Sequence, residues 1–210
     1  MENGVFKPTT IGTPQGGVIS PLLANIVLNE LDWRLEQAGF RFVRYADDFV
    51  IVCKSRSQAK AALTEVEKIM TDLGLQLSPE KTKVASYGKG YEFLGFRLSS
   101  RSRTMRPKSV EKFKMKIRDL TRRCHNLDRR VIEKLNQVIR GTANYFAASF
   151  STCLRRFLAL DKWIRMRLRC MKLKRKSCHD NYKLRMVYFD KLGLLKLSDF
   201  ARAAMCKHAT

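Results

Sequence analysis

Hydrophobic positions in the first part of the chain follow helical spacing in two places. Apolar residues recur at intervals of three and four after the Ser20-Pro21 step, which predicts a helix over 21–37. A second stripe of this kind follows Ser57 and runs to Gly74. We expect Ser57 to cap that helix and Gly74 to end it.

Short β-rich runs lie between and after these helical stretches. Residues 41–52 contain two apolar runs on either side of a short acidic centre, which predicts a hairpin with the acids at its turn. Residues 75–77 predict a short strand. Residues 84–87 and 91–98, separated by a glycine-rich step, predict a further hairpin.

The pattern changes after the polar segment 99–108, and from there on it is helical only. It predicts helices over 109–126, 130–147 and 151–173, followed by one or two shorter ones. The fold expected from these patterns is an α+β fragment with antiparallel hairpins, followed by an all-α helical bundle.

Charge separates the same two halves. Residues 1–100 contain 12 basic and 11 acidic side chains, whereas residues 101–210 contain 30 and 8. The net charge of +23 therefore resides almost entirely in the second half, and nucleic acid is the usual partner of so basic a segment. Apolar runs stay shorter than the roughly 20 residues that a bilayer crossing needs, so no membrane partner is expected.

The six cysteines are scattered without a CxxC pair, and the first residues have no hydrophobic secretory core. These features predict reduced thiols and a cytoplasmic location. The location expected is the bacterial cytosol or nucleoid, with an organelle as the alternative.

Asp47 and Asp48 are the strongest candidates for chemistry. Two adjacent carboxylates on a tight turn repel each other, and a divalent cation offsets that repulsion through the hard oxygen ligands that Mg²⁺ prefers. Two such ions about 4 Å apart can drive nucleotidyl transfer. The alternative is an ordinary solvated turn, because Asp is common in hairpin loops.

Four ordered blocks across residues 9–98 change the balance between these readings. They are GTPQGGVISPLLANIVLNELDWRL, RYADDFVIV, LSPEKTK and YEFLGFRL. Their succession resembles the palm of reverse transcriptases, in the wording of group II intron proteins. Residues 109–176, with KLNQVIRGTANYF and LDKWIRMRLR, resemble the maturase-specific (thumb, or X) domain of the same family. The resemblance implies a partial palm over 1–100, a thumb over 101–180 and a short helical C-terminal tail over 181–210.

The resemblance also implies roles for individual residues. Asp47 and Asp48 match the catalytic aspartates that bind Mg²⁺, with Mn²⁺ as the alternative ion. Lys81 matches a basic residue that contacts or protonates the leaving phosphate, although a plain surface lysine fits the position equally well. The nucleotide- and primer-binding positions are Gln15, Gly16, Gly17, Tyr45, Ala46, Phe93, Leu94 and Gly95.

A basic stripe in the second half is expected to bind RNA, because its helix carries few acids that would make it an ordinary solvated face. The stripe consists of Arg155, Lys162, Arg165, Arg169, Lys172 and Lys176. Arg140, Asn144 and Tyr145 are candidates for further contacts to unpaired RNA, and Tyr145 fits a core position equally well.

The function implied is that of an RNA-directed DNA polymerase and maturase of the group II intron type, which assists splicing and retromobility. Its expected partners are intron RNA, an RNA template with a DNA primer, dNTPs and an upstream fingers–palm fragment. The family's third metal-binding Asp lies before GTPQGG, and residues 1–11 contain no Asp. We therefore expect the isolated chain to be inactive or to need complementation. The alternatives are a non-catalytic RNA-binding splicing cofactor and an inactive truncated relic.

Overall fold

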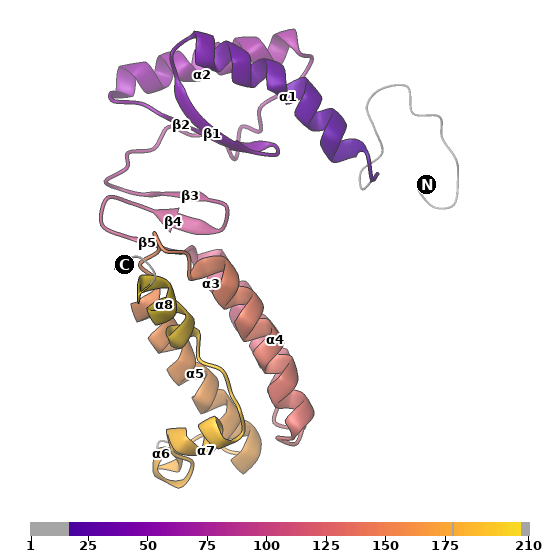
Figure 1. The fold of residues 1–210 in the computed structure, drawn as a ribbon, viewed down its shortest axis with the longest axis vertical. Coiled ribbons are helices and arrows are strands. Elements are labelled where there is room, and N and C mark those ends of the chain that lie inside the picture. The colour runs from indigo at the N-terminus through magenta and orange to yellow at the C-terminus, as the bar shows by residue number, and fades with distance from the viewer. Residues whose placement is uncertain (1–16, 178, 207–210) are drawn as a thin grey trace. The chain divides into compact units, whose positions relative to one another are not determined.

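The chain divides into two compact units, residues 1–85 and residues 86–210. The computed structural model describes residues 17–177 and 179–206. Both units combine helices with a small antiparallel sheet (Figure 1). The expected combination of antiparallel strands with a majority of helices is thus confirmed.

The first unit packs two helices on one hairpin. Helices α1 (Ser20–Gln37) and α2 (Arg56–Asp72) enclose β1 (Arg41–Tyr45) and β2 (Asp48–Val52) in the sequence. The buried side chains of the two helices form one cluster, and alternate residues of the hairpin pack against it. That cluster contains Leu28, Leu31, Leu35, Val66, Ile69 and Met70, with Phe42, Phe49 and Ile51 from the hairpin.

Both predicted helices of this unit are present, with one difference in capping. The residue that caps α2 is Ser55, whose Oγ accepts a hydrogen bond from the Gln58 amide at 3.1 Å, and Ser57 lies inside the helix. The predicted strand at 75–77 is absent. No neighbouring strand pairs with that segment among the described residues, and Leu77 instead packs against the helical cluster.

The second unit begins with a three-stranded antiparallel sheet in the order β3 (Tyr91–Phe93), β4 (Phe96–Leu98) and β5 (Arg103–Met105). The predicted pairing of 84–87 with 91–98 was wrong, because the chain turns inside the second run and pairs β3 with β4. The polar segment 99–108, in which the sequence pattern predicted no helix or strand, contains β5. Met105 at the end of that strand is 1% exposed and belongs to the core.

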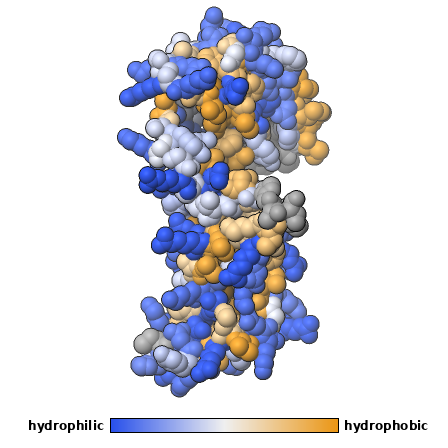
Figure 2. Space-filling model, turned by 60° about the vertical axis from the view of Figure 1, so that its left-hand side comes forward, coloured by the Kyte–Doolittle hydropathy of each residue, from blue (hydrophilic) through white to orange (hydrophobic). Residues whose placement is uncertain are grey.

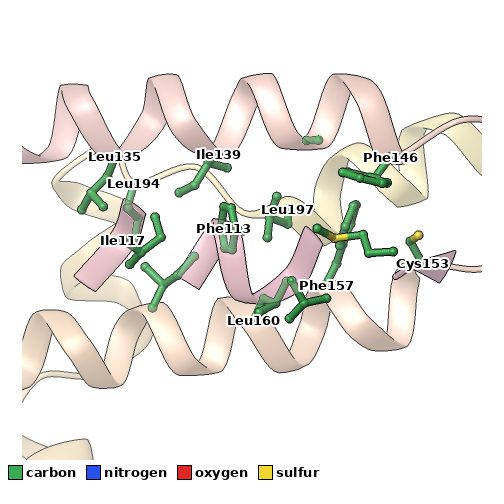
Figure 3. Packing of buried hydrophobic residues seen from close by; sticks show 14 of the residues in the cluster. Phe113, Ile117, Leu135, Ile139, Phe146, Cys153, Phe157, Leu160, Leu194 and Leu197 are labelled. Atoms are coloured by element: carbon green, nitrogen blue, oxygen red, sulfur yellow. The ribbon is translucent and has the colours of Figure 1, made fainter. Parts of the chain in front are cut away.

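Helices make up the rest of the second unit, and the three long ones predicted are confirmed. They are α3 (Pro107–Leu120), α4 (Arg129–Phe146) and α5 (Leu154–Leu173), followed by α6 (Asp180–Lys183), α7 (Met186–Lys191) and α8 (Leu197–Cys206). Helix α3 packs on α4, while α8 packs on both α4 and α5. Figure 3 shows side chains from α3, α4, α5 and α8 pointing into one interior.

Helix α8 is built into this core. Leu197 and Ala201 are buried in it. The helix start is held by Asp161 of α5, a side chain only 4% exposed, whose two oxygens accept the amides of Leu197 at 2.9 Å and Ser198 at 3.0 Å. Asn136 of α4 holds the preceding turn through Gly193 and Leu195. The segment expected as a tail therefore completes the bundle.

Candidate active site and nucleic-acid surface

The candidate metal site lies at the tip of the β1–β2 hairpin. Tyr45 pairs with Asp48, so Ala46 and Asp47 form the two-residue turn between them. Ala46 has a φ of 53°, a conformation that favours glycine and is costly for alanine. Asp47 and Asp48 are both exposed. The predicted hairpin with its acids at the turn is confirmed, and the turn conformation is a strained one.

The two faces of this hairpin differ. Phe42 and Phe49 face the helical cluster. The opposite face carries Asp48 together with Tyr45, which is 67% exposed, and Val43, which is 61% exposed. The site therefore presents one carboxylate beside a tyrosine ring and a second carboxylate at the tip of the turn.

Arg44 secures this turn from the packed face. Its Nη1 donates to the carbonyl oxygen of Ala46 at 2.9 Å and to Oδ1 of Asn25 at 2.9 Å. Its Nε and Nη2 bind both carboxylate oxygens of Asp32 on α1. The hydrogen bond to Asp32 is the main cause that raises the pKa of the Arg44 guanidinium above its usual value. Sequence reasoning missed this residue, although Arg44 is the first residue of the block that contains the two acids.

Two carboxylates suit a divalent cation but do not complete its coordination. Asp47 and Asp48 supply hard oxygen ligands on an exposed turn, which fits Mg²⁺ or Mn²⁺. Over residues 17–177 and 179–206, no three His, Cys, Asp or Glu side chains gather in a way that could hold a metal ion. If this turn binds a metal ion, it would supply two of the ligands, and the remaining ones would be water, nucleotide phosphates or further protein groups.

The other predicted residues of the first unit are placed as follows. Lys81 is exposed and lies in a turn, where its backbone amide donates to the carbonyl of Ser78 at 3.2 Å. Gly17 is half-buried just before α1. Gln15 and Gly16 lie outside the described residues. Lys81 and the Asp47-Asp48 turn belong to the same unit, and their proposed joint action stays a prediction.

The second predicted contact point, Phe93-Leu94-Gly95, forms the turn between β3 and β4. Leu94 and Gly95 both have positive φ values, 45° and 80°, as a two-residue type I′ turn requires. The Gly95 carbonyl accepts the Arg106 amide at 2.9 Å and the Ser109 hydroxyl at 3.1 Å. A Cβ added at Gly95 would lie 3.3 Å from the Ser109 hydroxyl oxygen, so glycine also suits the space.

Tyr145 explains why this turn tolerates a leucine at positive φ. Its hydroxyl donates to the Leu94 carbonyl at 2.8 Å, and its ring stacks on Phe96 at 5.8 Å between centroids. Helix α4 thus fixes the β3–β4 turn from outside. Asn144 and Arg140 on the same helix are exposed, as RNA contacts would need to be.

The predicted basic stripe on α5 divides into two kinds of residue. Six side chains were expected to be available to RNA, but only four of them are exposed. The surface available to a phosphate backbone is therefore smaller than the sequence alone indicates. The exposed members are Arg155, Lys162 and Lys172 on α5 and Lys176, which was expected on the same stripe but lies beyond the end of the helix at Leu173. Arg165 and Arg169 are half-buried beside the segment that follows α5.

Arg169 has contacts inside the protein. Its Nε donates to the Leu184 carbonyl at 2.9 Å, and its guanidinium lies 5.4 Å from the centre of the Phe189 ring. Burial is the main cause that lowers the pKa of Arg169, and the neighbouring Arg165 adds to it. Arg169 therefore ties α5 to the α6–α7 segment, whatever it contributes to RNA.

The few acids of the second unit include some already paired with a neighbouring cation, and the excess of basic residues is left without acidic partners in number. Asp180 is buried against Arg175 at 3.0 Å, and Asp190 pairs with Lys196 at 2.8 Å. Figure 2 shows hydrophilic side chains over most of the visible face, with apolar side chains gathered in patches between them. None of the helices in the described part of the chain has the length and apolar character of a membrane span.

Comparison with known sequences gives one match for each half of the chain, and the first match extends past residue 85 into the second unit. The family described as reverse transcriptase (RNA-dependent DNA polymerase) matches residues 1–98, and the group II intron maturase-specific domain matches residues 110–189. The chain thus carries a segment similar to reverse transcriptases and, after it, a segment similar to the maturase-specific domain of group II intron proteins. Reverse transcriptases as a family use divalent metal ions, and the maturase-specific domain implies RNA binding.

Individual relatives agree with this family. Protein YkfC of Escherichia coli K12 is 34% identical over 133 residues, which cover 47% of this chain and 35% of that protein. The group II intron-encoded protein LtrA of Lactococcus lactis is 36% identical over 84 residues, 40% of this chain and 13% of LtrA. The retron Ec86 reverse transcriptase of Escherichia coli is 32% identical over 76 residues, 34% of this chain and 24% of that enzyme. The chain thus spans about a third or less of the length of these relatives.

Proposed function

We propose that the chain supplies part of the palm and the thumb of an RNA-directed DNA polymerase and maturase of the group II intron type. The observation that carries the proposal is the exposed Asp47-Asp48 pair at the tip of a hairpin in the segment that matches reverse transcriptases. The maturase-specific match in the same chain favours a group II intron protein over other reverse transcriptases.

In this proposal Asp47 and Asp48 bind Mg²⁺, with Mn²⁺ as an alternative. The bound ion would polarise the primer 3′-hydroxyl and the phosphate oxygens of the incoming dNTP. Tyr45 and Ala46 would lie beside the primer end, and Lys81 would contact the leaving phosphate. Residues 1–100 would form the palm part.

The thumb part, residues 101–180, would bind intron RNA through the exposed cations of α5, through Lys176 just beyond it, and through the polar residues of α4. The α5 cations follow one side of the helix, and a salt-dependent phosphate contact requires only exposure and charge. The Phe93-Leu94-Gly95 turn would contact the primer strand. Template RNA, DNA primer and dNTPs are the proposed partners, and a cytoplasmic location is part of the proposal because those partners are found there.

Primer extension tests the polymerase role. The purified chain would be assayed with Mg²⁺ on an RNA template with a DNA primer, alone and together with a supplied fingers–palm fragment. We expect extension only in the complemented sample, because the described residues offer the metal ion only two carboxylate ligands, Asp47 and Asp48. Asp47→Ala should abolish it, whereas Glu67→Gln on α2 should not, since that carboxylate is exposed on a helix distant in sequence from the turn. Extension that survives Asp47→Ala would refute the assignment.

A non-catalytic RNA-binding cofactor is the second candidate. It is favoured by the lack of a third potential metal ligand beside the Asp47-Asp48 turn among the described residues. The two candidates differ in one respect that can be measured. A cofactor would promote splicing of its intron RNA with Asp47→Ala as well as without the change, and complementation would produce no extension.

A further inference from the structure

Arg44 has an unusual set of partners for a residue in a β-strand. One guanidinium group binds the Asp32 carboxylate through two nitrogens, at 2.8 Å from Nε and 2.5 Å from Nη2. Its third nitrogen reaches Asn25 and the Ala46 carbonyl, both at 2.9 Å. The side chain is 13% exposed, so these contacts are made largely away from water. Every nitrogen of the group is engaged.

The Ala46 carbonyl is the informative partner. Ala46 is the first residue of the strained turn, and its carbonyl belongs to the peptide that leads into Asp47. A turn with a positive φ at alanine persists only when surrounding contacts over-determine it. The bond from Arg44 fixes the plane of that peptide, and with it the direction in which the Asp47 side chain leaves the backbone.

Asp32 supplies the other half of the arrangement. It binds the guanidinium in a two-pronged geometry that fixes the orientation of the group and balances its charge. A positive charge close to two metal-binding carboxylates would otherwise compete with the cation. The ion pair therefore gives the turn a rigid donor without adding net positive charge beside it.

Lysine cannot reproduce this geometry. An ammonium group is a compact point charge, whereas the planar guanidinium directs donors toward Asp32 on one edge and toward Asn25 and Ala46 on the other. Arg44→Lys thus keeps the charge and removes the fixed direction, which makes it the sharpest substitution at this position.

We propose that Arg44 is a positioning residue for the metal-binding turn, held by Asp32 and Asn25 of α1 and acting through the Ala46 carbonyl. The inference rests on the proposed function in so far as Asp47 and Asp48 bind a divalent cation. In the described part of the chain, Arg44 itself makes no hydrogen bond or ion pair with either of these two carboxylates.

The first measurement needs no metal. Amide resonances and hydrogen exchange of Ala46, Asp47 and Asp48 would be recorded by NMR in the full chain and in Arg44→Lys. We expect shifted resonances and faster exchange at the turn, with the rest of the unit unchanged. If the turn amides are identical in the two proteins, the proposal is overturned.

The second measurement uses Mn²⁺ as a paramagnetic probe of the turn. Substituting groups that orient metal ligands typically lowers metal affinity 10–100-fold, so we expect a loss of about tenfold in Arg44→Lys. Arg34→Lys is the matched control. Arg34 also links α1 to a carboxylate, that of Asp72 at 2.7 Å, but it does not contact the turn. Equal losses of Mn²⁺ affinity in both variants would reduce Arg44 to a structural ion pair and overturn the proposal.

Asn25→Ala protects the test against misfolding. It removes one partner of the Arg44 Nη1 and leaves the Asp32 pair intact, so the unit should fold, with a smaller loss of Mn²⁺ affinity in the same direction. If Arg44→Lys does not fold, Asn25→Ala alone decides. The proposal is then overturned if Asn25→Ala leaves both the turn amides and the Mn²⁺ affinity unchanged. If the wild-type turn binds no Mn²⁺ while Arg44→Lys still alters the turn amides, the proposed metal role fails and the positioning role stands.

Discussion

Asp161→Ala is expected to destabilise the second unit more than any substitution of a surface acid. The side chain is buried, and its two oxygens accept backbone amides of Leu197 and Ser198 at the start of α8. Hydrogen bonds to a charged acceptor contribute about 1.5–3 kcal/mol each, and the two share one carboxylate, so about 3–5 kcal/mol is expected in total. The first amides of a helix have no partner within the helix, so both would be left unsatisfied in a buried place.

Urea denaturation followed by tryptophan fluorescence measures this loss. The chain has two tryptophans, Trp33 in the first unit and Trp163 in the second, so a Trp33→Phe background reports on the second unit alone. Asp161→Asn should fall between wild type and Asp161→Ala, because it keeps the shape and one acceptor oxygen. The free energy of unfolding comes from linear extrapolation.

Asp199→Ala is the control for this prediction. Asp199 lies in the first turn of α8, but it is exposed, and within the described residues its ion-pair partner is Arg202, three residues later. Its loss should cost below about 1 kcal/mol, the usual range for exposed pairs. If Asp161→Ala costs no more than Asp199→Ala, the carboxylate does not hold α8 and the account of how the bundle closes is refuted.

Other substitutions in the second unit separate RNA affinity from stability. Reversal to Glu of the four exposed stripe cations should weaken RNA binding in a filter assay and flatten the log–log salt slope by about 3, at roughly 0.7 per contact, with helicity in circular dichroism unchanged. These cations are Arg155, Lys162, Lys172 and Lys176. An unchanged affinity would make the stripe an ordinary solvated face. Arg169→Ala should instead lower the free energy of unfolding by about 1–3 kcal/mol, and with it the urea midpoint, because it removes the bond to the Leu184 carbonyl. Tyr145→Phe should cost about 1 kcal/mol in the same assay, and wild-type stability would rule out its bond to the Leu94 carbonyl as a support. Leu168→Ala should cost about 2–5 kcal/mol, because this fully buried side chain would leave a cavity, and a cost near zero would contradict its place in the core.

Sequence periodicity predicted the helices because their burial is periodic. In α4 the buried residues Ile132, Leu135, Ile139 and Ala143 recur at intervals of three and four, so the pattern alone identifies the helix and its inner face. The β1–β2 hairpin was equally predictable from the sequence, since alternate residues face the helices and the acids mark the turn.

The β3–β4 turn was placed wrongly for a physical reason. Leu94-Gly95 is a poor turn signal, because leucine rarely adopts a positive φ, and Gly88-Lys89-Gly90 is a stronger one. The observed turn is stabilised by distant groups, the Tyr145 hydroxyl and the Ser109 hydroxyl. Contacts across such separations in sequence leave no local pattern.

The polar anchors were missed in the same way. Asp161 appears in the sequence as a lone acid in a basic helix, yet its partners lie 36 and 37 residues later. Arg44 was indistinguishable from other basic residues until Asp32, 12 positions earlier, was brought beside it. Spacing predicts which side chains share a face, but it does not show which carboxylate or carbonyl will meet a given guanidinium.

The position of α8 in the second unit has a consequence for the order of folding. One core joins Phe96 near the start of the unit to Ala201 near its described end, so closing it requires a loop of about a hundred residues, which is entropically slow. Helices α3 and α4 are neighbours in sequence and can pair early. Helix α8 can dock only after α5 has presented Asp161 to it. We therefore expect changes in α8 to speed unfolding while leaving the folding rate nearly unaltered, as for contacts formed after the transition state.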